Sequence, residues 1–231
     1  MDNNEHILDN PVWNAFTTGN QELSHGDDTV RYLSEDVSPF VGLKDLNATN
    51  FQKLWNFLEN GRVVVVMAQR GVVIPGMWKT LFAVDVEQMV YRGNTHTVDA
   101  SQRVVSLGRE DVPAMLELTK MTDPGPFEQH TIRFGHYEGI YRNGRLAAMA
   151  GQRMNPVPYA EISAVCTHPD FTGSGYASLL MKRQINRMLA SASIPFLHVK
   201  SSNERAIRLY QHLGFAIRKS RCVYVIQKNN D

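Results

Sequence analysis

The chain has 231 residues, 43% of them hydrophobic, which is enough to bury one large core or two modest ones. Its 24 lysines and arginines nearly balance 23 aspartates and glutamates, and this balance argues against nucleic acid or an anionic membrane surface as a partner. No run of apolar residues reaches the roughly 18 that a membrane-spanning helix needs.

The first 100 residues carry the pattern of a small α/β unit. Phe51, Leu54, Trp55 and Leu58 follow helical spacing, and residues 63–66 and 88–91 have the composition of buried strands. Polar residues 93–97 then separate two patterned halves of the chain. We therefore place a domain boundary near residue 100, with residues 1–100 forming a supporting or lid domain that walls one side of the active site.

The second half, residues 101–231, opens with a strand-like segment at 103–107. A helix follows that has Pro113 in its first turn and Val112, Met115, Leu116 and Thr119 on its inner face. Residues 137–141 and 146–152 read as two strands, and Asn143-Gly144 between them is a strong two-residue hairpin signal.

A strand, a glycine loop and a helix occupy the middle of this half. Ile162, Ala164 and Val165 suit a buried strand, and Gly173 and Gly175 follow it where a helix begins. The first amide groups of a helix lack intrahelical partners and lie at the positive end of the helix dipole, so they bind phosphate groups well. That helix keeps Ala177, Met181, Ile185 and Met188 on one face.

The chain ends with a strand at 195–199, a further helix and a strand at 221–227. Asn203 is a suitable N-cap for the helix, and Gly214 a suitable terminator. Because Ala206, Leu209, Tyr210 and Leu213 share one stripe, the phenol is expected to face the sheet.

These motifs resemble the GNAT superfamily of N-acetyltransferases over residues from about 101 to 231. The resemblance rests on Gly173-x-Gly175-x-Ala177 after the strand and on Asn203-x-x-Ala206-x-x-x-Tyr210-x-x-x-Gly214-Phe215 further along. It implies an α/β fold with a mixed, mostly antiparallel central sheet flanked by helices, here preceded by a smaller α/β N-terminal domain. It also implies an enzyme that moves an acetyl group from acetyl-CoA to a primary amine by direct attack in a ternary complex. The two distant cysteines and an N-terminus without the basic and apolar regions of a signal peptide favour a cytoplasmic setting.

The resemblance further implies roles for particular residues. The loop amides would cradle the pyrophosphate of acetyl-CoA, the central strand would hold its pantetheine arm, and the helix cap would lie close by; the residues are Gly173, Ser174, Gly175, Tyr176 and Ala177, then Val165, Cys166 and Thr167, and Asn203. Tyr210 would stabilise the leaving thiolate. Glu161 would accept the proton of the amine, although it could instead pair with a neighbouring arginine, and His168 and His198 are alternative bases.

Two positions depart from the family pattern. The family usually has Gln or Arg three residues before the first glycine and often a basic residue directly before it, whereas this chain has Asp170 and Thr172. Lys182 or Arg183 could compensate. Cys166 could in principle carry an acetyl group, but a cysteine in an apolar strand is usually inert packing.

Two other classes of protein fit part of the pattern. A Rossmann-type dinucleotide enzyme would need a third glycine where Ser178 stands and an acidic residue after the strand that ends near Lys200. An acyl-CoA-binding sensor without catalysis would keep the fold and lose the chemistry. Cys166 and Cys222 are far apart and lack metal-ligand spacing, so we expect no metal site, and the acceptor amine stays unnamed.

Overall fold

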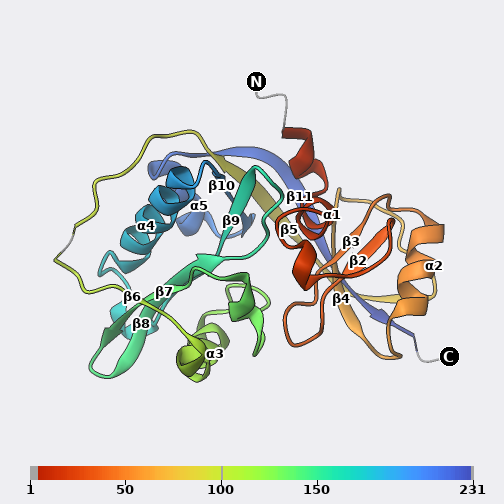
Figure 1. Ribbon diagram of the computed structural model, residues 1–231, viewed down its shortest axis with the longest axis horizontal. Coiled ribbons are helices and arrows are strands. Elements are labelled where there is room, and N and C mark those ends of the chain that lie inside the picture. Colours follow the sequence, from red (N-terminus) through yellow and green to blue (C-terminus); the bar gives the residue numbers. More distant parts are fainter. Residues whose placement is uncertain (1–4, 100, 230–231) are drawn as a thin grey trace.

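The fold is a long, twisted sheet with helices on both sides, and the N-terminal part of the chain covers one end of it (Figure 1). The computed structural model describes residues 5–99 and 101–229. None of the helices in these two segments is both long and apolar enough to cross a membrane.

The large sheet has eight strands in the order β4-β11-β5-β10-β9-β8-β7-β6. Their bounds are β4 Val63–Ala68, β5 Trp78–Tyr91, β6 Val105–Ser106, β7 Glu138–Arg142, β8 Arg145–Gln152, β9 Tyr159–Thr167, β10 Ile194–Lys200 and β11 Phe215–Lys228. Within the described residues every neighbouring pair in this sheet is antiparallel except β9 and β10, which run parallel. The expected mixed, mostly antiparallel sheet is confirmed.

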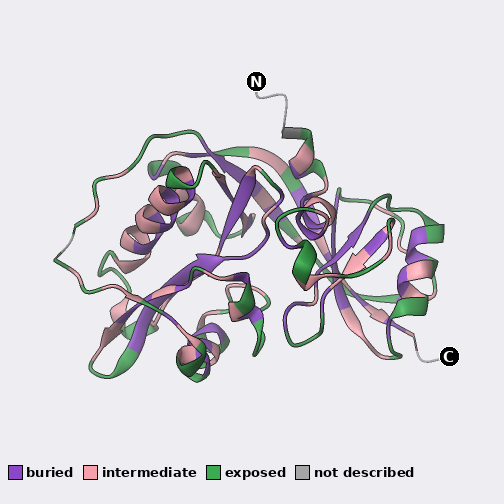
Figure 2. Ribbon diagram, in the orientation of Figure 1, coloured by how far each residue is buried: buried purple, intermediate pink, exposed green. Residues whose placement is uncertain are grey.

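Three helices cover the faces of this sheet: α3 Val112–Thr122, α4 Tyr176–Ala190 and α5 Glu204–His212. Helix α4 packs on β8, β9 and β10, and α5 packs on β11. Met181 and Ile185 of α4 join Leu197 of β10 in one buried cluster, whereas Met115 of α3 joins Met149 of β8 in another. Figure 2 shows the strands as the buried centre and the outer helix faces as exposed.

The N-terminal layer contains α1 Pro11–Phe16, α2 Ala48–Phe57 and a three-stranded antiparallel sheet of β1 His25–Gly26, β2 Val30–Tyr32 and β3 Val41–Leu43. Short 3-10 turns occur at Glu5–Asp9 and Gln21–Leu23 here, and at Arg109–Asp111, Thr131–Phe134 and Pro169–Phe171 later in the chain. A parallel bridge between Phe40 and Val65 joins this layer to β4. Phe16, Val65 and Phe196 share one buried cluster, so the layer and the large sheet have a common core.

Most elements lie where the sequence predicts them. The Asn143-Gly144 hairpin has both residues at positive φ (51° and 75°), as a two-residue turn requires. Asn203 caps α5 by accepting a hydrogen bond from the Ala206 amide, and Gly214 ends the segment at φ 101°. On α3 the buried position is Leu118 rather than Leu116, which is only partly buried.

The predicted boundary at residue 100 lies outside the described residues. Strands β4 and β5 precede it, yet β5 lies between β11 and β10 in the large sheet. One sheet therefore includes strands from both sides of the boundary, and a division into two units stays a prediction.

Candidate active site

Strands β9 and β10 separate from each other partway along the sheet. They pair only at Tyr159–Glu161 against residues 194–196, and within the described residues the pairing does not continue toward the carboxyl ends. Ligands of sheet proteins commonly bind where neighbouring strands diverge at their carboxyl ends. The residues beyond the last pair thus face a gap within the sheet.

A bulge in β9 lies beside this gap. Between two paired positions β9 advances three residues while β8 advances two, and Ala164, in the extra length, has φ 52°. A non-glycine residue in this conformation is strained, and a bulge leaves backbone groups without strand partners. The gap is lined by Ser163, Ala164 and Val165. The strained residue therefore lies where a ligand could form hydrogen bonds with backbone groups that lack a strand partner.

Three cavities adjoin one another through the gap. The first, the glycine-loop cavity of about 400 Å³, shares Val165, Asn203 and Tyr210 with the second, the strand gap of about 140 Å³. The third, the sheet trough of about 500 Å³, meets the gap at Arg153 and His198. A ligand held at the glycine loop can therefore extend through the sheet toward a second ligand in the trough.

The glycine-loop cavity is formed by the segment from Phe171 to Ser178 together with the start of α5. Gly173 and Gly175 have φ 85° and 77°, and no atom lies within 4 Å of the position that a Cβ would take at either residue. Gly175 caps α4, whose first amides lie beyond it. The loop thus leaves open space in front of unpaired amides, which suits a phosphate group.

The acidic residue next to this loop does not enter the cavity. Asp170 is exposed and pairs with Arg145 at 3.1 Å, while Thr172 Oγ1 donates to the Pro169 carbonyl oxygen at 2.9 Å. Asp170 is therefore neutralised outside the cavity. Arg183 is bound to Glu138, with Nε–Oε1 at 3.1 Å, and the structure does not place it near the loop.

Tyr210 lies where the glycine-loop cavity meets the strand gap. Its ring packs edge-on against Phe215 with ring centroids 6.2 Å apart, and no described residue hydrogen-bonds its hydroxyl. The side chain is half-buried because it faces a cavity rather than the packed core. Exclusion of water around the ring raises the pKa of Tyr210 to about 12, so the phenol stays protonated at neutral pH.

The side chain of Cys166 faces away from the cavities. It is buried in a cluster with Met115 and Leu118 of α3, and burial raises the pKa of its thiol to about 12. A thiol with this pKa is almost entirely protonated at neutral pH and is a weak nucleophile.

Glu161 is the centre of a buried ion pair. Its side chain is 0% exposed, and its two oxygens accept from Arg153 Nε at 2.9 Å, Arg153 Nη2 at 2.7 Å and His198 Nδ1 at 2.8 Å. Burial opposes ionisation of Glu161, but the Arg153 guanidinium and the His198 hydrogen bond outweigh it and lower the pKa to about 2. The arginine-paired alternative is thus the arrangement that the structure contains.

His198 connects this pair to the strand gap. Since Nδ1 donates to Glu161, Nε2 is the accepting nitrogen, and the side-chain amide nitrogen of Gln88 lies 3.1 Å from it. Burial lowers the pKa of His198 although Glu161 opposes that shift, so the imidazole is neutral at pH 7. His198 lines both the gap and the trough, whereas Glu161 lines neither.

Comparison with known proteins identifies the family. The FR47-like protein family model matches residues 137–225. The solved structure of a GNAT-family acetyltransferase from Novosphingobium aromaticivorans is 34% identical, covers 97% of this chain and 100% of its own, and superposes with a TM-score of 0.89. The chain belongs to the GNAT superfamily of N-acetyltransferases.

Further relatives agree with membership of the GNAT superfamily. The ribosomal protein bS18-alanine N-acetyltransferase of Salmonella typhimurium is 29% identical over 115 residues, which are 47% of this chain and 77% of the relative. A GCN5-related N-acetyltransferase from Kribbella flavida, 12% identical, covers 95% of this chain and 96% of its own with a TM-score of 0.61, and this likeness shows the fold alone.

Most residues that the GNAT resemblance selected lie together. The glycine-loop cavity is lined by Val165, Thr167, Gly173, Ser174, Gly175, Tyr176, Ala177, Asn203 and Tyr210. Glu161 and the Cys166 side chain are the two that the structure keeps out of the cavities. His168 lies 3.8 Å from Asp170, outside all three.

Sequence reasoning missed Arg153 and Arg205. Arg153 follows the predicted strand at 146–152 and meets Glu161 only because β8 and β9 are antiparallel neighbours. Arg205 lines the glycine-loop cavity from the exposed first turn of α5. A basic residue two positions after the predicted N-cap was the available signal for Arg205, and none pointed to Arg153.

Proposed function

We propose that this N-acetyltransferase transfers an acetyl group from acetyl-CoA to a primary amine by direct attack, with both substrates bound at once. The observation that carries the proposal is the run of three adjoining cavities through the sheet. It provides a phosphate-binding loop at one end, a narrow gap in the middle and a separate trough at the other end.

The residues present fit acetyl-CoA. The amides from Gly173 to Ala177 would hold the pyrophosphate in the open space in front of the loop, and the exposed Arg205 adds a positive charge beside it. Val165 and Thr167 would pair their backbone groups with the pantetheine amides in place of the missing partner strand. Asn203 lines both the loop cavity and the gap, so it lies along the same path.

Tyr210 would stabilise the departing thiolate by a hydrogen bond. A phenol with a pKa of about 12 is less acidic than a thiol with a pKa of about 8.5, so full proton transfer to the thiolate is uphill. Donation of a hydrogen bond to the developing charge needs no transfer, and the hydroxyl has no competing partner among the described residues.

Glu161 would assist proton removal indirectly. A carboxylate with a pKa of about 2 and four donors on its oxygens, one of them the Met154 amide, is a weak base, but it stabilises positive charge on His198. The neutral His198 imidazole would take the amine proton at Nε2 once the Gln88 amide nitrogen releases it. That amide nitrogen also donates to the Leu8 carbonyl oxygen, and the Gln88 side-chain oxygen accepts from Arg218 Nη1. The pairing of carboxylate and imidazole follows the logic of a catalytic triad.

The position of Cys166 supports direct attack. Its thiol faces α3 and is protonated, so no cysteine among the described residues is placed to carry the acetyl group in the gap. Initial rates measured at varied concentrations of both substrates should give intersecting double-reciprocal lines. Parallel lines would point to a covalent intermediate instead.

Turnover separates the enzyme from an acyl-CoA sensor. Acetyl-CoA is incubated with the protein and a panel of primary amines, and release of the CoA thiol is followed. We expect release that depends on the amine and on the protein. Acetyl-CoA binding without release for any amine would support the sensor alternative.

A further inference from the structure

The sheet trough has an apolar floor formed by three strands. Strand register places Val86 beside Lys200 and Arg221, then Val84 beside Val223, then Phe82 beside Val225, and each row is one step farther from His198. Val223 and Val225 in turn face Met67 and Val65 of β4. Beyond Lys200, which lines the trough at the end near His198, the floor is thus formed by valine, methionine and phenylalanine.

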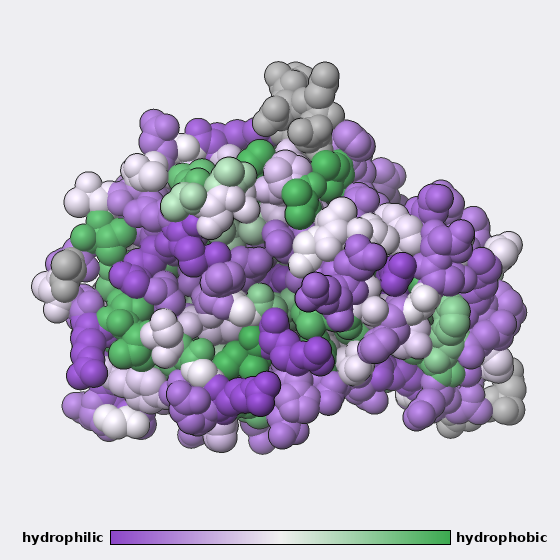
Figure 3. All heavy atoms as spheres, viewed as in Figure 1, coloured by the Kyte–Doolittle hydropathy of each residue, from purple (hydrophilic) through white to green (hydrophobic). Residues whose placement is uncertain are grey.

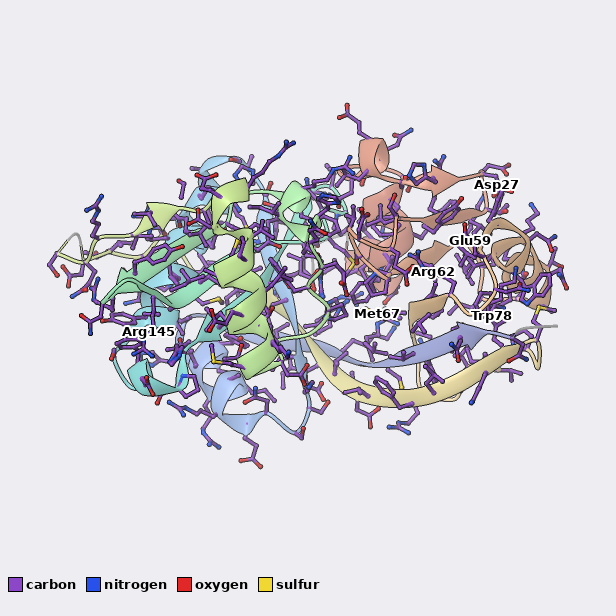
Figure 4. The ribbon with its side chains drawn as sticks, turned by 90° about the horizontal axis from the view of Figure 1, so that it is seen from below. Asp27, Glu59, Arg62, Met67, Trp78 and Arg145 are labelled. Carbon is purple, nitrogen blue, oxygen red and sulfur yellow. The ribbon has the colours of Figure 1, made fainter. Side chains whose placement is uncertain are left out.

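The trough is long as well as apolar. Gln88, which pairs with His198, and Phe82 are six residues apart on β5, which at roughly 3.3 Å per residue is about 20 Å. Hydrophobic residues gather near the middle of the face drawn in Figure 3. Met67, which is labelled in Figure 4 and lines the trough, lies beside β11, where it pairs with Val223.

Carboxylates stand on the walls of the trough. Asp123 pairs with Lys200 at 2.7 Å near the gap, and Glu35 pairs with Arg62 at 3.3 Å near the far end. Glu128 has no ion pair among the described residues, and burial followed by the charge of Glu35 raises its pKa. Asp123 and Glu35 are balanced by Lys200 and Arg62, and Arg153 and Lys200 also line the trough. Glu128 is the lining carboxylate without an ion pair among the described residues, and it would repel a carboxylate bound beside it.

The face of the floor offers few hydrogen-bond partners to the amide groups of a peptide. Strand β11 is paired on both edges, with β4 and β5, so its backbone donors and acceptors are used within the sheet. Strand β5 pairs with β11 along its length but with β10 only from Val86 to Val90, so beside Val84 and Phe82 its other edge is not paired with β10. Peptide groups laid on the face of β11 would lose water without gaining hydrogen bonds, whereas methylene or aromatic groups would gain from burial.

We propose that the trough is the acceptor site and that the acceptor is a primary amine with an extended apolar body and no carboxylate. This proposal rests on the proposed acetyl transfer. The reacting nitrogen lies at the His198 end, and the apolar body covers the valine rows as far as Phe82. Continuity of the trough with the strand gap identifies its occupant as the acceptor.

The first test compares three acceptors at saturating acetyl-CoA: butylamine, decylamine and aminodecanoate. We expect kcat/KM to rise roughly two- to fourfold for each added methylene until the trough is filled, because each buried methylene adds binding energy. Aminodecanoate, with the same length and a terminal carboxylate, should react at least about tenfold more slowly than decylamine. Equal kcat/KM for all three amines would overturn the proposal.

The second test uses Phe82→Ser with Leu81→Ser as its control. The two residues are neighbours on β5 and are 55% and 40% exposed, so neither change empties the core, but only Phe82 lines the trough. Phe82→Ser should lower kcat/KM for decylamine about 5- to 20-fold and leave butylamine nearly unchanged. Leu81→Ser should change neither. The same loss for both amines, or in both variants, would contradict the assignment.

Binding of the reaction product tests the apolar site without requiring turnover. Calorimetry with N-decylacetamide and N-butylacetamide should show tighter binding of the decyl compound, weakened by Phe82→Ser and not by Leu81→Ser. If these affinities hold while no amine is acetylated, the proposed chemistry fails and the apolar site stands. If amines are acetylated but the two acetamides bind alike, the chemistry stands and the apolar site is wrong.

Discussion

Tyr210 lines both the glycine-loop cavity and the strand gap, and no described residue hydrogen-bonds its hydroxyl. Tyr210→Phe keeps the ring packing on Phe215 and removes only this donor. We expect turnover to fall roughly 10- to 10³-fold with little change in acetyl-CoA affinity. Single-turnover acetylation and calorimetry measure the two quantities. An unchanged chemical step with a lower melting temperature would make the tyrosine purely structural.

The Glu161 carboxylate should dominate the acid sensitivity of this part of the core. Glu161→Gln leaves Arg153 and His198 buried beside a neutral amide, and we expect a loss of about 3–5 kcal/mol in unfolding free energy at pH 7. Its pKa is lowered from 4.5 to about 2, so its stabilisation is complete above about pH 5 and is lost as pH falls toward 2. The difference in unfolding free energy between wild type and Glu161→Gln should therefore decrease as the pH is lowered.

Urea denaturation of both proteins at pH 7 and pH 3 measures this difference. Glu117→Gln, an exposed change on α3, is the control and should have little effect at either pH. In the same Glu161→Gln protein turnover should fall about 10²- to 10⁴-fold while acetyl-CoA still binds. A variant as stable and as active as wild type would remove both roles.

Single residues were predictable from sequence where the signal is local. The glycine loop and the Asn203 cap each depend on residues within one turn, and the structure has them as predicted. The pairing of Glu161 with Arg153 depends on β8 and β9 lying side by side, and no sequence pattern near either residue predicts it. The partial burial of Tyr210 was also not predictable from local sequence. Helical spacing indicates which face of the helix points toward the sheet, but not whether a cavity lies beneath that face.

At the scale of elements, the loop before α4 allows a matched test. Gly175 and Gly144 have nearly the same φ, 77° and 75°, and neither has an atom within 4 Å of a built Cβ. Valine at either position therefore incurs a similar backbone strain of about 1–2 kcal/mol without a clash. Only Gly175→Val should abolish acetyl-CoA binding, because Gly144 lies in the β7–β8 hairpin, away from the loop cavity.

Calorimetric titration of the two variants with acetyl-CoA measures this difference, and thermal melting confirms that both are folded. Normal affinity in folded Gly175→Val would place the pyrophosphate elsewhere. Loss of affinity in both variants would show that strain, rather than the occupied space, causes the effect.

Strand lengths were the least predictable feature of the elements. The sequence marks residues 88–91 and 221–227, yet β5 and β11 each run for 14 residues, Trp78–Tyr91 and Phe215–Lys228. Their outer halves carry exposed polar side chains, including Lys79 and Ser220, which break the apolar pattern that identifies a strand. Pairing with neighbours, rather than composition, holds these segments extended.

For the whole molecule, the order of the strands in the sheet does not follow the division of the sequence into two halves. The resemblance to GNAT proteins covers residues from about 101, but β4 and β5 come from the first half and the floor of the trough needs both. A fold-level pattern in the second half could not reveal that strands from the first half complete its sheet. The trough could therefore not be predicted from the sequence.

This arrangement predicts that the chain can be cut near residue 100 but cannot lose its first part. Deleting residues 1–100 would remove β5 from between β11 and β10 and expose the buried side chains that pack on it, so residues 101–231 alone should show no cooperative unfolding and no acetyl-CoA binding.

A protease site inserted beside the exposed Ser101 leaves every strand pair intact. After cleavage there, the two pieces should stay associated through the sheet and keep activity. Gel filtration and the thiol-release assay before and after cleavage measure this. A 101–231 fragment that folds, binds acetyl-CoA and acetylates amines at the full rate would establish the second half as an independent catalytic domain.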